Sequence, residues 1–175
     1  MAGGDFPCKI KYPSEIERIT REMSIRGKYL EEYQVGETFQ TPGRTITEAD
    51  VGLFAGLTGD YNELHTNAAF MKESQFGERL VHGLLGLSVS VGLFFRLGFL
   101  EGTVIAFLGI EDWQFKAPIF FGDTLNTQLT VTDVKPSTSK PDRGVLRMEL
   151  ALVNQDGVTT QSGKMAFLIK ARHNL

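Results

Sequence analysis

The segment GDYNELH, residues 59–65, places two groups that can exchange protons on one short stretch of chain. Asp60 carries a carboxylic acid, and His65 is one of three histidines in the protein. Taken singly, Asp60 is readily explained as a turn residue and His65 as a packed histidine. Taken together, they could serve as a general acid and a general base, provided that their surroundings hold their protonation states apart.

A helix expected at residues 47–58 must position this pair. Thr47 is a good N-cap, and Asp50, three residues later, completes a variant of the capping box. Gly59 is expected to end the helix in the left-handed conformation that glycine adopts readily. The acid–base pair would then lie on the loop that leaves the helix. The apolar residues expected on or near one face of this helix are Val51, Leu53, Phe54, Ala55 and Leu57.

A longer and far more apolar helix is expected to begin at Gly83 and to run to about residue 97. Because it is hydrophobic all round, we expect it to be enclosed on nearly every side. Gly86 and Gly92 each lower its helix propensity by roughly 1 kcal/mol relative to alanine, a cost that is tolerable where something packs very close to the backbone. A short helix that begins after Thr66 or Asn67 is expected before it.

The second half of the chain alternates apolar and polar residues, which is the pattern of half-buried strands. Phe39 is expected in a short first strand, further strands are expected at 103–111 and 113–120, and the Asp-Gly pair at 156–157 indicates a hairpin. Sequential antiparallel strands with one apolar helix predict an α+β fold, in which the sheet curls around the helix. The open edge of such a sheet favours a dimer that pairs edges. The residues expected to face the core from the later strands are Leu125, Leu129, Val131, Leu146, Met148, Leu150, Leu152, Met165, Phe167 and Ile169.

Composition and charge argue against several classes of protein. The 175 residues are 42% hydrophobic and carry a net charge of −3, which fits one globular domain and disfavours a nucleic-acid partner. The most apolar run, residues 83–95, falls short of the ~20 residues of a membrane span. The single cysteine, Cys8, cannot form an internal disulfide, and no Cys/His cluster has the spacing of a zinc site.

Residues 1–28 are expected to form an N-terminal extension that precedes a single domain at 29–175. A polar helix is expected at 14–26, and we assign it no chemistry. The N-terminus lacks the apolar core of a secretory signal and is too acidic for a typical transit peptide. Together with the lone cysteine, these features predict a cytoplasmic protein.

Two longer stretches, FAGLTGDYNELH at 54–65 and FGERLVHGLL at 76–85, resemble the MaoC-like (R)-specific enoyl-CoA hydratases. The signature of that family is an aromatic residue, then Gly-Asp, any residue, Asn-Pro, an aliphatic residue and His. The stretch FKAPIFFGDTL at 115–125 is similar to the third segment of the family, and the resemblance spans residues 29–171. It implies the hot-dog fold, a curled antiparallel sheet wrapped around a long central helix. The residues that match the signature are Phe54, Gly59, Asp60, Asn62, Leu64 and His65.

The resemblance also implies a reaction, the reversible addition of water to a trans-2-enoyl thioester to give an (R)-3-hydroxyacyl thioester. Asp60 and His65 would be the catalytic acid–base pair, and which of them protonates carbon stays open. Gly83 would offer its backbone N–H to the thioester oxygen, in keeping with the unpaired N–H groups and partial positive charge of a helix start. A glycine lets a ligand oxygen approach the backbone closely, and one such donor is worth ~3 kcal/mol in a transition state.

The chain departs from the family pattern at two positions. Glu63 stands where proline is usual, and its negative charge could alter substrate preference or raise the proton affinity of the neighbouring carboxylate. Val91 stands where some members have a serine that supports the site. Ser88 and Ser90 are close in sequence, but neighbouring positions of a helix do not share a face.

Further residues of the site are predicted from their neighbourhood. Asn62 is expected to fix the loop by hydrogen bonding, and His82 to be structural. The apolar pocket for the acyl chain is expected to be lined by Phe54, Leu57 and Val91. The basic residues that could meet the phosphates of coenzyme A are Lys72, Arg96 and Lys116, although single basic residues are more often solvated surface groups.

The expected substrate is an acyl-CoA, with acyl carrier protein as the alternative carrier, and the expected assembly is a homodimer or higher homo-oligomer. No metal and no cofactor is implied, apart from the coenzyme A of the substrate itself. Two rival functions stay open, a hot-dog thioesterase and a non-catalytic module that binds acyl thioesters. The absence of an acid or base from residues 83–95 counts against the thioesterase. The acyl chain length and branching and the physiological direction are not predicted.

Overall fold

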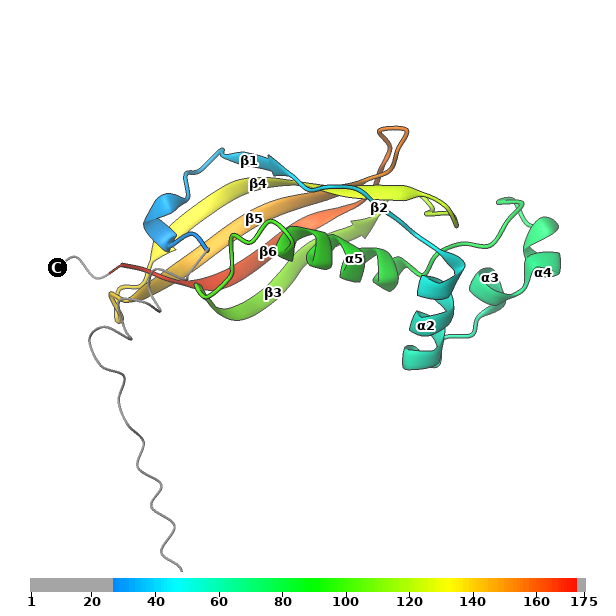
Figure 1. The fold of residues 1–175 in the computed structure, drawn as a ribbon, viewed down its shortest axis with the longest axis horizontal. Coiled ribbons are helices and arrows are strands. Elements are labelled where there is room, and N and C mark those ends of the chain that lie inside the picture. The colour runs from blue at the N-terminus through cyan, green and yellow to red at the C-terminus, as the bar shows by residue number, and fades with distance from the viewer. Residues whose placement is uncertain (1–26, 173–175) are drawn as a thin grey trace, which may run out of the picture.

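The computed structural model describes residues 27–172, in which a curved antiparallel sheet carries one long helix across a face (Figure 1). The expected helix at 14–26 and Cys8 lie outside the described residues. The strands run in the order β1-β4-β5-β6-β3, and β2 pairs with β4 off this path. The strands are β1 (Thr38–Gln40), β2 (Arg44–Thr45), β3 (Val104–Phe115), β4 (Thr124–Pro136), β5 (Arg143–Val153) and β6 (Thr159–Lys170).

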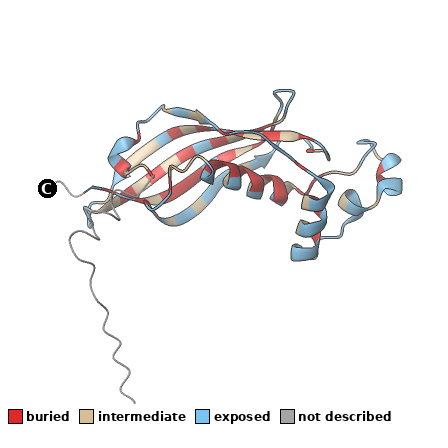
Figure 2. Ribbon diagram, viewed as in Figure 1, coloured by how far each residue is buried: buried red, intermediate tan, exposed pale blue. Residues whose placement is uncertain are grey.

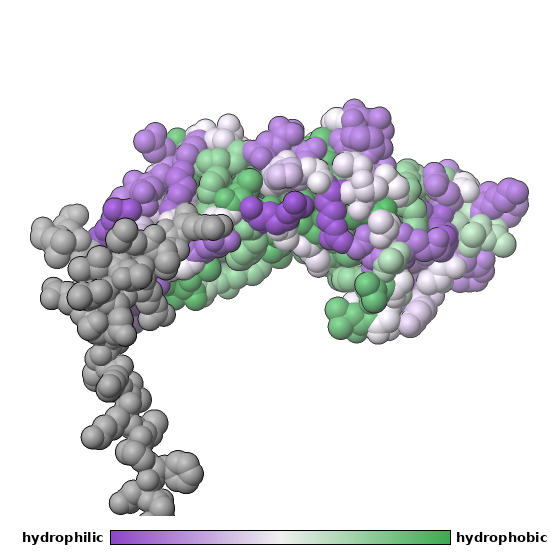
Figure 3. Space-filling view, in the orientation of Figure 1, coloured by the Kyte–Doolittle hydropathy of each residue, from purple (hydrophilic) through white to green (hydrophobic). Residues whose placement is uncertain are grey.

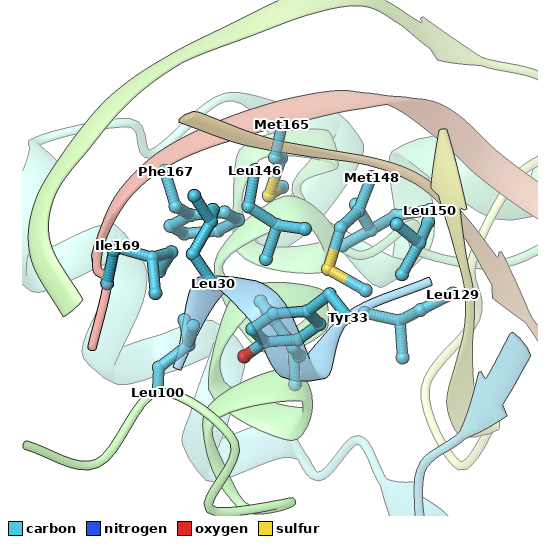
Figure 4. Close-up of a cluster of buried hydrophobic side chains, with 13 residues drawn as sticks. Leu30, Tyr33, Leu100, Leu129, Leu146, Met148, Leu150, Met165, Phe167 and Ile169 are labelled. Atoms are coloured by element: carbon cyan, nitrogen blue, oxygen red, sulfur yellow. The ribbon is translucent and has the colours of Figure 1, made fainter. Parts of the chain in front are cut away.

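The core lies between the sheet and the long helix α5 (Gly83–Phe95). The alternation in the later strands is confirmed, because the residues expected to face inward are almost completely buried (Figures 2 and 4). A short 3-10 helix, η1 (Leu30–Glu32), closes one end of this core with the side chains of Leu30 and Tyr33. The Tyr33 hydroxyl donates to the Phe99 carbonyl across 3.0 Å, so its polar end is satisfied inside the protein.

The long helix begins at Gly83 as predicted, but the expectation that it is enclosed on nearly every side is wrong for the single chain. One side of α5 packs on the sheet through buried residues such as Leu85, Val89 and Leu93. Its opposite side is open, with Leu84 59% and Phe95 40% exposed. The apolar residues on that open side are therefore available to another surface.

A single strand, β3, takes the place of the two strands expected at 103–111 and 113–120, and it ends at Phe115, short of the expected end. Its register with β6 passes from Glu111 opposite Lys164 to Gln114 opposite Ser162, so β3 has one residue more than its partner over this interval. Asp112 lies at the extra position with φ 53°, the one non-glycine residue with positive φ among residues 27–172. The bulge twists the strand without ending it, and this explains why the alternation looks interrupted in the sequence.

Three short helices lie beyond one end of the sheet (Figure 1): α2 (Glu48–Thr58), α3 (Glu63–Thr66) and α4 (Ala68–Lys72). The capping box of α2 is confirmed, because Thr47 accepts from the Asp50 N–H and Asp50 accepts from the Thr47 N–H. Burial raises the pKa of Asp50, but the hydrogen bonds from Thr47 and the charge of Arg44 outweigh this effect and lower the pKa overall. Arg44 also forms an ion pair with Asp50, which ties the start of α2 to strand β2.

The apolar face of α2 is narrower than the sequence suggested. Val51 and Ala55 are buried, and Phe54 is half-buried. Leu53 and Leu57, which were expected near this face, are 75% and 84% exposed, so that expectation is wrong for the single chain. The helix touches the rest of the protein along one narrow edge.

Candidate active site

The loop after α2 carries Asp60. Gly59 ends the helix as predicted, with φ 77°, in the left-handed region, and its N–H donates to the Ala55 carbonyl. Oδ1 of Asp60 accepts from the Asn62 N–H across 3.3 Å, which gives the loop an Asx turn. The Asp60 side chain is 51% exposed, so its carboxylate is accessible from solvent.

Asn62 begins the helix that carries His65. Its side-chain oxygen accepts from the Leu64 N–H across 3.0 Å and caps the N-terminus of α3, a helix that was not expected from the sequence. Glu63, the residue in place of the usual proline, accepts from the Asn67 side chain across 2.9 Å. This part of the loop is therefore held by short local hydrogen bonds.

His65 is oriented by a backbone carbonyl. Its Nδ1 lies 2.7 Å from the Leu80 carbonyl oxygen, which can only accept, so Nδ1 carries the proton. In the neutral ring, Nε2 then presents a lone pair, and it lies 4.0 Å from Oδ2 of Asp60. Both atoms can lie within hydrogen-bond distance of one water oxygen, which needs about 2.8 Å to each. The structure thus brings the sequence-predicted pair together.

His82 is the third member of this cluster. The side chain is 2% exposed, and its ring stacks on that of His65 with 3.7 Å between the ring centroids. Its Nε2 donates to the backbone carbonyl of Asp60 across 2.9 Å. The Phe54 ring also lies close to that of His82, with 5.1 Å between centroids and a tilt of 54° between the ring planes. Sequence reasoning gave His82 only a general structural role, because the contact between residues 60 and 82 depends on the fold.

The three side chains could in principle hold a metal ion, because their ligand atoms lie within 4.8 Å of one another. Two imidazoles and a carboxylate form a common donor set for divalent metals. In this arrangement Nε2 of His82 is occupied by its bond to the Asp60 carbonyl. Freeing it would move the proton to Nδ1, which is buried and has no partner among the described residues. The geometry therefore favours a hydrogen-bonded acid–base cluster over a metal centre.

A pocket of about 340 Å³ joins His65 to the start of α5. Gly83, the first residue of the helix, lines this pocket, and the N-cap His82 makes no side-chain hydrogen bond to the helix. A Cβ atom on Gly83 would lie 2.8 Å from the Phe115 ring, so only glycine fits here without movement of that ring. The residues that line the pocket are His65, Phe76, Leu80, Val81, Gly83, Phe115, Lys116, Ala117, Pro118, Ile119 and Gln161.

The remaining predicted residues are spread over several places. Leu57 is on the outer side of α2, and Val91 packs against the main core cluster, so neither lines this pocket. Lys116 does line it, whereas Arg96 borders a separate groove of about 390 Å³ beside α5, which Arg44 of β2 also lines. Lys72 lies in the last turn of α4 and is absent from both pocket linings.

The serine hydroxyls near Val91 form hydrogen bonds away from the pocket. Ser88 donates to the Leu84 carbonyl, and Ser90 is buried against Thr127 with 3.1 Å between the two hydroxyl oxygens.

Sequence reasoning missed two residues that the fold brings to the pocket, Phe115 and Gln161. They come from β3 and β6, and their spacing in the sequence gives no sign that they meet.

A family model covers the region that contains this cluster. The model of the MaoC-like domain matches residues 31–153. Protein MaoC of Klebsiella aerogenes is 45% identical over 103 residues, which make up 59% of this chain and 30% of that protein. An (R)-specific enoyl-CoA hydratase of Rhodospirillum rubrum is 34% identical over 109 residues, 62% of this chain and 72% of that enzyme. The match thus spans less than a third of the first relative and most of the second.

Solved structures share the architecture. The R-hydratase PhaJ1 from Pseudomonas aeruginosa, in its unliganded form, has a TM-score of 0.64 and 28% identity, over 82% of this chain and 86% of that one. A conserved hypothetical protein from Mycobacterium tuberculosis with a double hot-dog fold has a TM-score of 0.73 over 85% of this chain and 46% of that one. At 18% identity, that likeness concerns the fold alone.

Within residues 27–172, every helix is too short or too polar to cross a bilayer. The family model covers more than half of the sequence, and it includes the Asp60 loop and the start of α5. Because that match covers most of the chain, this protein belongs to the family of MaoC-like domains.

Proposed function

We propose that the protein is a hydro-lyase that interconverts trans-2-enoyl-CoA and (R)-3-hydroxyacyl-CoA. The observation that carries the proposal is the 4.0 Å separation between Nε2 of His65 and Oδ2 of Asp60, beside a pocket that reaches the first residue of α5. A base, an acid and a backbone N–H donor are the three groups that the reaction requires. The names of the Rhodospirillum rubrum relative and of the Pseudomonas aeruginosa neighbour support the same reaction class.

The hydration step can be written with these groups. A water molecule held between His65 and Asp60 loses one proton to the pair, and its oxygen forms a bond to the β-carbon of the enoyl group. Electron density moves to the thioester oxygen, where the Gly83 N–H and the partial positive charge of the helix start would stabilise it. A proton then reaches the α-carbon from the pair. Dehydration is the same sequence in reverse.

The tautomer of His65 favours this role. The Leu80 carbonyl holds the proton on Nδ1, so Nε2 is available to accept a proton from water on the side of the ring that faces Asp60. Uptake of that proton would give a cation 4.0 Å from a carboxylate, and the two opposite charges stabilise each other. No cofactor beyond the coenzyme A of the substrate enters this scheme, and acyl carrier protein is the alternative carrier.

The functional assembly that we propose is a homodimer. Among the described strands, β3 pairs on one side only, with β6. Its exposed apolar residues, together with the open side of α5, form hydrophobic surface that a second copy could cover (Figure 3). Light scattering should report a dimer, and Leu108→Lys on β3 should shift it toward monomer. The exposed apolar residues of β3 are Ile105, Phe107, Leu108, Ile110 and Phe115.

The test of the reaction is hydration of a panel of enoyl-CoAs, followed by absorbance, with chiral analysis of the product. Asp60→Asn should lower turnover by about a hundredfold or more, which is the usual size of an acid–base contribution, while circular dichroism stays unchanged. Near-wild-type hydration by this variant would overturn the assignment. Release of free thiol from acyl-CoA, unaffected by Asp60→Asn, would indicate a thioesterase instead. Binding of enoyl-CoA without turnover would indicate a binding module.

A further inference from the structure

A hydrogen-bond chain connects the edge strand β3 and its neighbour β6 to the first residue of α5. The indole N–H of Trp113 on β3 donates to Oε1 of Gln161 on β6 across 3.1 Å. Nε2 of Gln161 in turn donates to the Gly83 carbonyl across 3.0 Å. Because an indole can only donate and a carbonyl can only accept, the Gln161 amide can satisfy both partners in one orientation alone. Gln161 is 1% exposed, so water does not compete for these bonds.

Gly83 needs an external constraint. Glycine has more backbone freedom than any other residue, and the N-cap of α5 makes no side-chain hydrogen bond that would fix the first turn. The Gly86 N–H donates to the His82 carbonyl across 3.1 Å, which orients the peptide that carries the Gly83 N–H. Gln161 holds the next peptide by its carbonyl. Both peptide planes on either side of the Gly83 Cα are thereby fixed.

Two glycines leave the space that the side chains of Gln161 and Trp113 occupy in these hydrogen bonds. A Cβ atom on Gly86 would collide with Nε2 of Gln161 and would lie 2.7 Å from Cδ1 of Ile119. On Gly163, two residues after Gln161, a Cβ atom would lie 2.6 Å from Cε3 of Trp113. Two glycines therefore make room, one for the amide and one for the indole.

The β-bulge explains how Trp113 reaches this position. Phe115 lies directly opposite Gln161 in the β3–β6 register, so both side chains point to the same face of the sheet, toward α5. Trp113 shares that face with Phe115, because side chains two residues apart in a strand point the same way. The extra residue at Asp112 sets this alignment, and a bulge beside a functional site commonly re-aims a side chain in this manner.

We infer that Gln161 is a positioning residue for the oxyanion donor, and that Trp113 holds Gln161 in the orientation that this role requires. The inference rests on the proposed function, in which the Gly83 N–H polarises the thioester carbonyl. Gln161 acts through Gly83 and is not itself assigned contact with the reacting atoms. Loss of its amide would leave the pocket in place but release the Gly83–Leu84 peptide, which adjoins the peptide that carries the Gly83 N–H. The first turn of α5 could then shift that N–H, and a small misplacement of a catalytic group can cost about a hundredfold in rate.

The experiment uses the full chain and compares Gln161→Met, Trp113→Phe and Gln114→Met. Methionine keeps the length of glutamine and removes both hydrogen-bonding ends, and phenylalanine keeps a ring without the indole N–H. Gln114 lies on the exposed face of the same strand as Trp113 and serves as the matched control. Hydration kinetics separate kcat from KM. A chromophoric enoyl thioester, 4-dimethylaminocinnamoyl-CoA, reports carbonyl polarisation as a red shift of its absorption when bound.

Gln161→Met should lower kcat by about tenfold or more with a much smaller change in KM, and should reduce the red shift of the bound probe. Trp113→Phe should show the same two effects at smaller size, and Gln114→Met neither. Wild-type kcat and red shift in Gln161→Met would overturn the inference, and so would a loss of kcat with an unchanged red shift. If Gln161→Met does not fold, Trp113→Phe decides by the same criteria.

Failure of the proposed function would look different. If the wild-type protein hydrates no enoyl-CoA, the red shift alone tests whether Gln161 orients the donor. If Asp60→Asn leaves turnover unchanged while Gln161→Met removes the red shift, the reaction assignment fails and the positioning role stands. A bound probe without a red shift in the wild-type protein would overturn the role of Gly83, and with it the inference.

Discussion

The imidazole rings of His65 and His82 lie stacked, with 3.7 Å between centroids and 28° between ring planes. His65 comes from the short helix α3, and His82 immediately precedes α5. The stack therefore joins the acid–base loop to the helix start that would hold the substrate carbonyl. His82 also anchors the other catalytic candidate, because its Nε2 donates to the backbone carbonyl of Asp60. The buried side chain of His82 thus sets the position of Asp60 relative to His65.

His82→Phe should lower kcat by up to about a hundredfold, because the ring stack survives but the bond that fixes the Asp60 backbone is lost. His82→Gln, which keeps an N–H donor at a similar reach, should recover part of that loss. Steady-state kinetics of both variants measure kcat and KM, and unfolding curves check that both variants are folded. Equal losses in the two variants, or a change confined to KM, would contradict the positioning role.

Asp50→Ala should lower the free energy of unfolding by about 1 kcal/mol at pH 7, because it removes the reciprocal cap of α2. The pKa of Asp50 is lowered in the folded protein, so the carboxylate stabilises the fold above its unfolded pKa of about 4. The difference between wild type and variant should therefore shrink as the pH falls below that value. Denaturant titrations from pH 7 to pH 3 measure it.

Glu48→Ala is the control for that series, since Glu48 is a first-turn acid of α2 that takes no part in the capping box. Its ion pair with Arg79 is on the surface and should contribute little. An acid dependence of equal size in Glu48→Ala would show that general charge near the helix start, and not the cap, is responsible.

Gly86→Ala and Gly92→Ala should have opposite effects although both lie in α5. Alanine at 86 collides with the Gln161 amide and should destabilise the protein and reduce turnover, whereas at 92 a Cβ atom meets nothing within 4 Å. Gly92→Ala should raise the free energy of unfolding by about 0.5–1 kcal/mol through helix propensity. Thermal and denaturant unfolding of the pair provide the comparison. Destabilisation by Gly92→Ala would contradict the open environment found at this position.

Tyr33→Phe should cost about 1 kcal/mol at pH 7, the typical net value of a buried hydrogen bond, here that to the Phe99 carbonyl. Burial raises the pKa of Tyr33 above its usual value of about 10, and the charges of Glu37 and Glu32 add to the effect. A raised pKa in the folded state means that the contribution is complete below pH ~10 and is lost as the pH rises further. The difference between the two proteins should accordingly shrink in unfolding curves taken from pH 9 to pH 11. A constant difference across that range would exclude this linkage.

Local sequence determined much of this protein. The Thr47–Asp50 capping box, the left-handed Gly59 and the alternating strands follow from interactions between residues close in the chain, or from a period that one face of a sheet imposes. The identities of Asp60 and His65 as candidates also came from one short segment. The continuous β3 was missed because a bulge interrupts the period, and α3 because its cap, Asn62, lies inside the motif itself.

Tertiary structure alone decided which residues surround that pair. His82, Phe115 and Gln161 reach the site from three separate elements, and no local pattern encodes their meeting. The sequence indicated that something packs closely against the backbone at Gly86. It did not indicate that the neighbouring group is the Gln161 amide. Leu53 and Leu57 were expected near the apolar face of α2 because they are hydrophobic, but both are exposed in the single chain. The sequence shows that a side chain is hydrophobic, and it does not show which surface covers that side chain. Long-range contacts are set by how the sheet curves around α5, and this is why the positioning groups emerge only in three dimensions.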